Sequence, residues 1–255
     1  MIKRKLHIFK NRINGLFAGA STTDDFDWDK YHTHYKGELS DISKEHTQVL
    51  NTGDYEFKEN ELLIKREIAP LHPNHRLLYE TIIQLSPSTL MELGCGACDH
   101  LHNISVLAPD INLYGRELSY EQIKLARKRH PELKAGIMQL DITMPQPVNS
   151  IKVDIAFTQA VIMHLHTGNS HLVALSNIFR YAAKQVVLME NWTQHDFMGD
   201  IEFLFSEKML PWKELYFYYR ESIELKRPHL MVISSTPIES YKPLSDYSIL
   251  KDAVK

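Results

Sequence analysis

Cysteine is scarce in this chain, with only two among its 255 residues. Two cysteines cannot form the disulfide framework that stabilises many small secreted proteins. The chain also shows no secretory signal and no apolar run of about eighteen residues, the length that a membrane-spanning helix needs. We therefore expect a reducing, cytoplasmic setting.

A strong charge of either sign is also missing. The 29 lysines and arginines are offset by 32 aspartates and glutamates, which leaves a net charge of -3. Proteins that bind the phosphates of nucleic acid usually carry a clear excess of basic residues. Nucleic acid is therefore not an expected partner, and the sequence does not indicate the oligomeric state.

The start of the chain is locally basic. Over residues 1–17, apolar side chains recur at helical spacing beside several lysines and arginines. A basic amphipathic helix of this kind can make weak contact with a membrane surface, or it can pack on its own domain. Both interpretations stay open.

The pattern of apolar residues predicts an α/β fold. With 44% hydrophobic and 24% charged residues, the chain can bury one sizeable core. Helical and strand patterns alternate from residue 74 onward, and this order predicts a parallel sheet with helices on both faces. The predicted helices cover residues 74–85, 99–107, 119–130, 169–183 and 200–209, and the predicted strands cover 88–94, 111–117, 135–141, 153–159, 185–191, 214–222 and 229–235.

The two ends of the chain depart from this alternation. The last two predicted strands are joined by a short polar connection that contains Lys226, Arg227 and Pro228, which favours an antiparallel hairpin over a crossover. The stretch of residues 21–45 is polar and aromatic, without strand alternation. We expect residues 1–70 to be an irregular, partly helical extension that acts as a lid, and residues 71–255 to form the main domain.

The stretch "MELGCGACDH", residues 91–100, follows the first predicted strand of the alternating part. Ligands of open parallel sheets collect at the carboxyl ends of strands, and glycine there lets the backbone approach a ligand closely. A dinucleotide fingerprint would need a third glycine at position 99, after Gly94 and Gly96. The chain has Asp99, whose carboxylate would repel a phosphate at the helix end, so NAD is disfavoured.

Acidic residues lie at three successive predicted strand ends. Glu92 accompanies the glycines, and Glu117 follows about 20 residues later, the distance at which an acid accepts the hydroxyls of a ribose. Asp141 closes the next strand, where its carboxylate can accept a hydrogen bond from an adenine amino group. This arrangement indicates a site for an adenosine cofactor.

In these features the chain resembles the class I S-adenosylmethionine-dependent methyltransferases, over roughly residues 74–236. The segments "MELGCGACD", "YGRELSYEQIKLARKR", "QLDIT" and "VDIAFTQAVIMHL" stand in the order and spacing of that family. The resemblance implies S-adenosyl-L-methionine as cofactor and a Rossmann-like methyltransferase fold, with a mostly parallel seven-stranded sheet, a C-terminal antiparallel hairpin and an N-terminal helical extension. The cofactor-binding residues that it implies are Glu92, Gly94, Cys95, Gly96, Glu117, Leu118, Asp141, Ile142 and Gln159.

The two cysteines form a C-x-x-C motif in the same loop. Cys98 stands where many members of the family have a third glycine, which leaves the shape of the loop in question. No second cysteine pair exists to complete a zinc site of four thiolates, so we interpret the placement of Cys95 and Cys98 as incidental. The H-x-H pairs fall mostly on predicted helices or loops, where this spacing does not put both rings on one face. We therefore assign no metal ligand.

Transfer of a methyl group to a hydroxyl requires alignment of the acceptor and removal of its proton. His164 and His166 follow the predicted strand 153–159, at the edge where an acceptor would enter, and histidine titrates in a suitable range. Glu190, at the end of the next strand, is the alternative base. These three residues are the catalytic candidates.

The sequence gives less information about the methyl acceptor than about the cofactor. Aromatic residues beside acids suit sugar rings, and the segments "QAVIMHLHTGN" and "KRPHLMVISS" are faintly similar to the methyltransferase part of bacterial enzymes that terminate O-antigen chains. We expect O-methylation of a saccharide or related polar metabolite, in surface-glycan or secondary metabolism. A small-molecule N-methyltransferase and a non-catalytic S-adenosylmethionine-binding protein of the same fold remain as alternatives.

Overall fold

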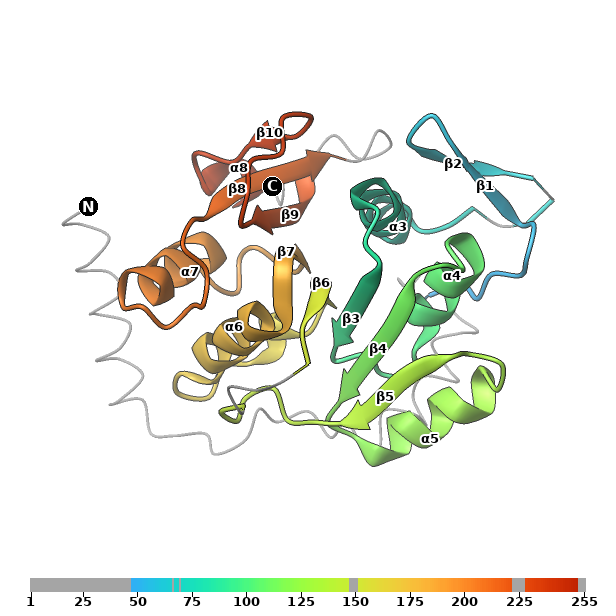
Figure 1. Cartoon of the computed structure of the whole chain (residues 1–255), viewed down its shortest axis with the longest axis horizontal. Helices are drawn as coiled ribbons and strands as arrows, with labels where there is room; N and C mark the ends of the chain where they lie inside the picture. The colour runs from blue at the N-terminus through green and yellow to red at the C-terminus, as the bar shows by residue number, and fades with distance from the viewer. Residues whose placement is uncertain (1–46, 66, 69, 147–150, 222–227, 252–255) are drawn as a thin grey trace.

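The computed structural model describes residues 47–251 except 66, 69, 147–150 and 222–227 (Figure 1). The basic stretch 1–17 and the greater part of the expected extension therefore lie outside the described residues. Within the described ranges, no helix combines the length and the apolar character that crossing a lipid bilayer requires.

The centre of the molecule is an eight-stranded sheet with the order β10-β8-β9-β7-β6-β3-β4-β5. Five neighbouring strands, from β7 to β5, pair in parallel, whereas β9, β8 and β10 pair antiparallel. The strands are β3 (Thr89–Leu93), β4 (Asn112–Glu117), β5 (Ala135–Gln139), β6 (Val153–Gln159), β7 (Ala182–Met189), β8 (Tyr216–Glu221), β9 (Pro228–Ser234) and β10 (Lys242–Pro243). The mostly parallel α/β fold agrees with the sequence prediction.

One strand of the central sheet was not predicted. The two-residue β10 pairs with β8 and raises the number of strands in this sheet from the expected seven to eight. Two residues carry no alternation of apolar and polar side chains, so a periodicity argument cannot detect such a strand.

Helices cover both faces of the sheet, as Figure 1 shows. They are α3 (Pro73–Leu85), α4 (Asp99–Leu107), α5 (Tyr120–Arg129), α6 (Ser170–Tyr181), α7 (Phe197–Ser206) and α8 (Ser248–Lys251). The apolar residues of α6, α7 and α8 belong to one buried cluster, and those of α3, α4 and α5 belong to a second cluster. The sheet is therefore covered by a separate core on each face.

Side-chain caps explain where two of the helices begin. The hydroxyl of Ser119 accepts a hydrogen bond from the amide of Gln122, so α5 begins where the sequence predicts it. Helix α7 begins three residues earlier than the predicted range 200–209, because the carboxylate of Asp196 accepts a hydrogen bond of 3.3 Å from the amide of Gly199.

The described part of the expected helical extension contains a β-hairpin, which corrects that prediction. Strands β1 (Tyr55–Lys58) and β2 (Glu61–Ile64) pair antiparallel around the two-residue turn of Glu59 and Asn60. Both turn residues have positive φ, 52° and 69°, which is the conformation that favours such a hairpin. Since the turn lacks glycine, the usual sequence signal of this hairpin is missing.

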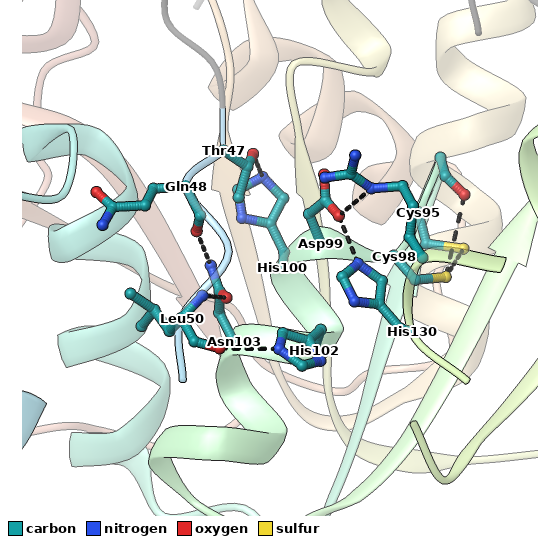
Figure 2. A network of polar contacts seen from close by, with 12 residues as sticks. Thr47, Gln48, Leu50, Cys95, Cys98, Asp99, His100, His102, Asn103 and His130 are labelled. Carbon is teal, nitrogen blue, oxygen red and sulfur yellow. Dashed lines mark hydrogen bonds and ion pairs between the residues drawn. The ribbon is translucent and has the colours of Figure 1, made fainter. Parts of the chain in front are cut away.

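The segment before the hairpin is fixed to α4 by buried polar side chains (Figure 2). Asn103, fully buried, accepts a hydrogen bond of 2.8 Å from the amide of Leu50 and donates one of 2.7 Å to the carbonyl of Gln48. It also donates to the hydroxyl of Tyr79 on α3, at 2.9 Å. Leu50 is buried in the same core as α4, so this segment packs as part of the main domain.

Replacement of Asn103 by alanine is expected to lower the free energy of unfolding by about 2 to 4 kcal/mol, because it leaves buried polar groups without hydrogen bonds. Urea unfolding followed by circular dichroism measures the change. Asn112→Ala is the control, since Asn112 is exposed and donates to the carbonyl of Ser88 at 3.3 Å. Equal stability of both variants would contradict the assigned role of Asn103.

Candidate functional site

The parallel strands bring their carboxyl ends to one edge of the sheet. Strand β3 pairs with β4 on one side and with β6 on the other, so the order of the strands reverses at β3. Open parallel sheets bind ligands at such a reversal, outside the carboxyl ends of the strands. The loop that follows β3 holds the predicted glycines, and Glu117 and Gln159 end the strands on its two sides.

Gly94 is required by the geometry of this loop. Its φ is +74°, and its amide donates a hydrogen bond of 2.7 Å to the carbonyl of Arg116. A Cβ atom at this position would lie only 2.6 Å from Cγ2 of Val161, in the loop after β6. A larger residue is therefore excluded both by the backbone conformation and by the close approach of two loops.

Glu117 connects the glycine loop to α5. One carboxylate oxygen accepts a hydrogen bond of 2.9 Å from the amide of Gly96, and the other accepts one of 2.8 Å from the amide of Ser119. A carboxylate held at the end of β4, beside the glycine loop, is the kind of hydrogen-bond acceptor that ligand hydroxyls require. The position and orientation of Glu117 fit a residue that binds a ribose.

Glu92 is a buried carboxylate at the same loop. Its Oε2 has no hydrogen-bond partner among the described residues. Burial raises the pKa of Glu92 well above its ordinary value, and the nearby Cys95, Asp99 and Glu117 act in the same direction. A buried unsatisfied oxygen is costly, so this position favours a ligand that supplies a donor, such as an ammonium group.

The residues after β4 and β5 form the other half of the site. Oδ1 of Asp141 accepts hydrogen bonds from the amide and the hydroxyl of Thr143, at 2.8 and 2.6 Å, which fixes the carboxylate beside the strand end. The carbonyl of Ile142 accepts a hydrogen bond of 2.8 Å from Asn177 on α6. Leu118 is 48% exposed, so an apolar side chain lies open to solvent next to Glu117.

The cysteines do not present their thiols to this site. Cys95 and Cys98 are buried, with their sulfur atoms 3.4 Å apart. Cys95 packs against β4, since a Cβ atom on Gly115 would lie 2.8 Å from its sulfur. The hydrogen bond from Cys98 and burial raise the pKa of the Cys95 thiol well above its ordinary value. Cys95 can therefore contribute to a ligand site mainly through its backbone.

Asp99 connects α4 to the end of α5. Its carboxylate lies 3.1 Å from Nε of Arg129 and 2.5 Å from Nε2 of His130. Figure 2 shows the ring of His130 directed at this carboxylate. The ring of His130 stacks on that of His102 at 4.3 Å. The N-terminus of α4 is thus occupied by a buried and paired carboxylate, which is unfavourable for the pyrophosphate of a dinucleotide.

The carboxylate of Glu190 accepts several hydrogen bonds from donors within the protein. Its carboxylate accepts a hydrogen bond of 2.6 Å from the hydroxyl of Thr158 and bonds of 3.0 to 3.3 Å from three successive amides. These amides, of residues 161–163, begin the short 3-10 helix η1 (Ile162–His164). Burial raises the pKa of Glu190, although the four donors favour the charged form. The geometry gives Glu190 the part of a helix cap.

His164 and His166 lie on η1 and in the loop after it, and both reach solvent. Partial burial lowers the pKa of His164, and the nearby His166 lowers it further. The ring of His166 lies 5.3 Å from that of His195, which precedes α7. His195 stacks on His171 at 4.4 Å, and Nε2 of His171 is 3.6 Å from Asp200 on α7.

The sequence analysis did not single out His171, His195 and Asp200, which the structure brings close to His166. They lie on two helices and a loop, and no local spacing relates them. The only available signal was that each follows one of two neighbouring parallel strands. Among the residues that the structure describes, no group of three His, Cys, Asp or Glu side chains is arranged to hold a metal ion.

Comparison with protein families matches residues 91–189 to the family described as "Methyltransferase domain". The match begins in β3, contains the glycine loop, Glu117, Asp141 and η1, and ends with β7. Comparison with curated proteins gives no match.

Solved structures give partial similarities. The amino pentose methyltransferase CalS10 of Micromonospora echinaspora is 20% identical over 47% of this chain and 50% of its own, with a TM-score of 0.40. DesVI of Streptomyces venezuelae is 21% identical over 46% and 50%, with a TM-score of 0.38. A TehB-like methyltransferase of Corynebacterium glutamicum is 18% identical over 66% and 89%, with a TM-score of 0.48. The chain thus covers half the length of the first two.

Gly94→Ala is expected to lower the free energy of unfolding by about 2 to 5 kcal/mol, through the left-handed backbone and the contact with Val161. The double variant Gly94→Ala with Val161→Ala should recover part of this loss, because it removes the two nearest methyl groups. Gly168→Ala is the control: its φ is +56° but no atom lies within 4 Å of its Cβ position, so only the backbone cost applies. Urea unfolding of the variants tests this, and an equal loss in Gly94→Ala and Gly168→Ala would refute the contact.

Proposed function

We propose that the chain is a class I S-adenosylmethionine-dependent methyltransferase, which transfers a methyl group from this cofactor to an oxygen of a saccharide or related polar metabolite. The single observation that supports this proposal best is the shared position of Glu92, Glu117 and Asp141 at three neighbouring strand ends around the glycine loop. We place the reaction in the cytoplasm, in surface-glycan or secondary metabolism.

The residues of the site fit the three parts of the cofactor. The unsatisfied buried oxygen of Glu92 suits the ammonium group of the methionine part, beside the backbone of Gly94, Cys95 and Gly96. Glu117 binds the ribose hydroxyls. We assign the contacts with the adenine to Leu118, Asp141 and Ile142. Gln159, at the end of β6, is assigned a further contact with the cofactor.

The protein has to position the acceptor and remove its proton. When bound, the sulfonium of S-adenosylmethionine supplies an activated methyl group, so no further activation of the donor is needed. We assign removal of the proton to His164, since its ring is exposed on η1, directly after the Val161 that meets Gly94, and its lowered pKa favours the neutral, basic form near pH 7. His166 lies next to it, and Glu190 holds η1 in position.

The role of Glu190 is therefore different from that of a base. Its carboxylate accepts hydrogen bonds from Thr158 and from three amides of η1, and it is buried. A group that is fixed by so many internal donors is poorly placed to accept a proton from an acceptor. We propose that Glu190 contributes to the reaction indirectly, because it holds η1, and with it His164, in position.

Glu117→Ala is expected to weaken S-adenosylmethionine binding about 10- to 100-fold, because a charge-assisted hydrogen bond to the ribose is lost. Calorimetry of the full chain measures the affinity. Glu132→Ala is the matched control, since Glu132 is exposed after α5. Unchanged affinity in a folded Glu117→Ala protein would remove this residue from the cofactor site, and binding of NADH in place of S-adenosylmethionine would overturn the proposed function.

His164→Asn is expected to lower the rate of methyl transfer by about 10²- to 10⁴-fold, the usual contribution of a general base, with little change in cofactor affinity. The rate of the unchanged protein should rise with pH through the pKa of His164, because only the neutral imidazole accepts the proton. Because the pKa of His164 lies below the ordinary value of histidine, the rate should rise at a lower pH than it would with an ordinary histidine as base. Mass spectrometry with labelled cofactor and a panel of acceptors measures the rate.

His166→Asn and Glu190→Gln serve as comparisons for the base. Glu190→Gln should lower both stability and rate, since it weakens the bonds that hold η1. A loss of rate below about fivefold in His164→Asn would exclude a general base at this position. Methylation of nitrogen rather than oxygen by the active protein would favour the small-molecule N-methyltransferase, and cofactor binding without turnover would favour the non-catalytic alternative.

A further inference from the structure

Three imidazole rings and a carboxylate form a contiguous group at the carboxyl edge of the sheet. The ring of His195 lies between that of His166, at 5.3 Å, and that of His171, at 4.4 Å, and Nε2 of His171 is 3.6 Å from Asp200. We name these four residues the histidine cluster. They come from the loop after β6, the start of α6, the loop after β7 and the first turns of α7.

The cluster adjoins the proposed cofactor site. Val161 meets the glycine loop, because its Cγ2 lies 2.6 Å from the Cβ position of Gly94. Five residues later the same loop carries His166. Strands β6 and β7 are parallel neighbours, so the loops that follow them leave the sheet side by side. The loop that meets the glycine loop therefore also carries His166, and the neighbouring loop after β7 carries His195.

The charges around the cluster disfavour an anionic acceptor. The two stretches that form this edge, residues 160–171 and 190–200, contain no lysine or arginine. They contain three acidic residues, Glu190, Asp196 and Asp200. Burial and the neighbouring Asp196 raise the pKa of Asp200 to about 7, although Lys251 on α8 opposes this shift. A phosphate only accepts hydrogen bonds and is bound best by fixed positive charge, which these stretches lack.

The rings suit hydroxyl groups better than a metal ion. His171 and His195 stack with an interplanar angle of 6°, so their nitrogens point along parallel planes rather than toward one centre. A neutral imidazole offers one donor and one acceptor, and a hydroxyl group offers the same two functions. The His171 and Asp200 side chains are 17% and 15% exposed, and His195, which stacks on His171, is also partly buried.

We propose that the histidine cluster is the acceptor site and that it selects a neutral, polyhydroxylated acceptor over a phosphorylated one. His166 and His195 bind hydroxyl groups of the acceptor, and the pair of His171 and Asp200 positions the ring of His195. This inference rests on the proposed function, because it places the acceptor beside the S-adenosylmethionine site. It narrows that function to methylation of a sugar hydroxyl rather than of a sugar phosphate.

The test uses the full chain with labelled histidines and saturating S-adenosylhomocysteine. Methyl glycosides of common hexoses and the matching hexose 1-phosphates are titrated while the imidazole signals are followed by nuclear magnetic resonance. At least one glycoside should shift the signals of His166 and His195 to saturation, and the 1-phosphate of the same sugar should bind about tenfold more weakly or worse, as expected for an anion beside two stretches that contain no lysine or arginine. Equal or tighter binding of the phosphate, or no shift with any glycoside, overturns the proposal.

The positioning pair has its own readout. Asp200→Asn should lower the pKa of His171, because the carboxylate at 3.6 Å is lost, and should weaken glycoside binding about three- to tenfold. His171→Phe keeps an aromatic ring against His195 but loses the contact with Asp200, and should weaken binding to a similar degree. Glu207→Gln, an exposed change at the end of α7, is the control. An unchanged pKa of His171 together with unchanged affinity in both variants excludes the positioning role.

The failure of this proposal is distinct from the failure of the proposed function. Calorimetry with S-adenosylmethionine is run on the same samples. Cofactor binding without any glycoside effect on the cluster rejects the acceptor site alone. Absence of cofactor binding rejects the proposed function, and with it the acceptor site that depends on it.

Discussion

The carboxylate of Glu190 holds the turn after β6 in place, and much of the site depends on that turn. It binds the hydroxyl of Thr158 and three amides of η1 from a buried position. With η1 fixed, Val161 meets Gly94 so closely that only glycine fits there. The same turn carries His164 toward the solvent-exposed edge. One buried acid therefore fixes the turn that contacts the glycine loop and carries the proposed base.

The opposite side of the glycine loop is held by a different set of contacts. Helix α4, which begins directly after the loop, is tied to α5 through Asp99 with Arg129 and His130. It is also tied to the segment before the β-hairpin, through Asn103. The loop thus lies between two rigid supports, which is what a preorganised binding site requires. A change in either support is expected to reach the cofactor site through the backbone rather than through direct contact.

The sequence predicted the parts of the site that depend on local pattern. Strand periodicity placed Glu117 at the carboxyl end of a strand, and parallel strands necessarily share that edge, so its closeness to the glycine loop followed from topology. The hydroxyl of Ser119 opened α5 as expected. By contrast, the turn at Glu59 and Asn60 lacks glycine, and the hairpin around it was missed. Likewise, the cap at Asp196 makes α7 begin three residues earlier than predicted.

The sequence by itself determined the mostly parallel α/β fold and the strand-end acids, because periods of two and 3.6 residues and the rules for parallel sheets operate on neighbouring residues. Only the tertiary structure decided what Glu190 does, since its partners on η1 are brought to it by the pairing of β6 with β7. It also decided that His166, His171 and His195 meet, although they belong to different elements. Contacts of that kind depend on how loops fold back over the sheet edge, so the spacing of residues along the chain does not predict them.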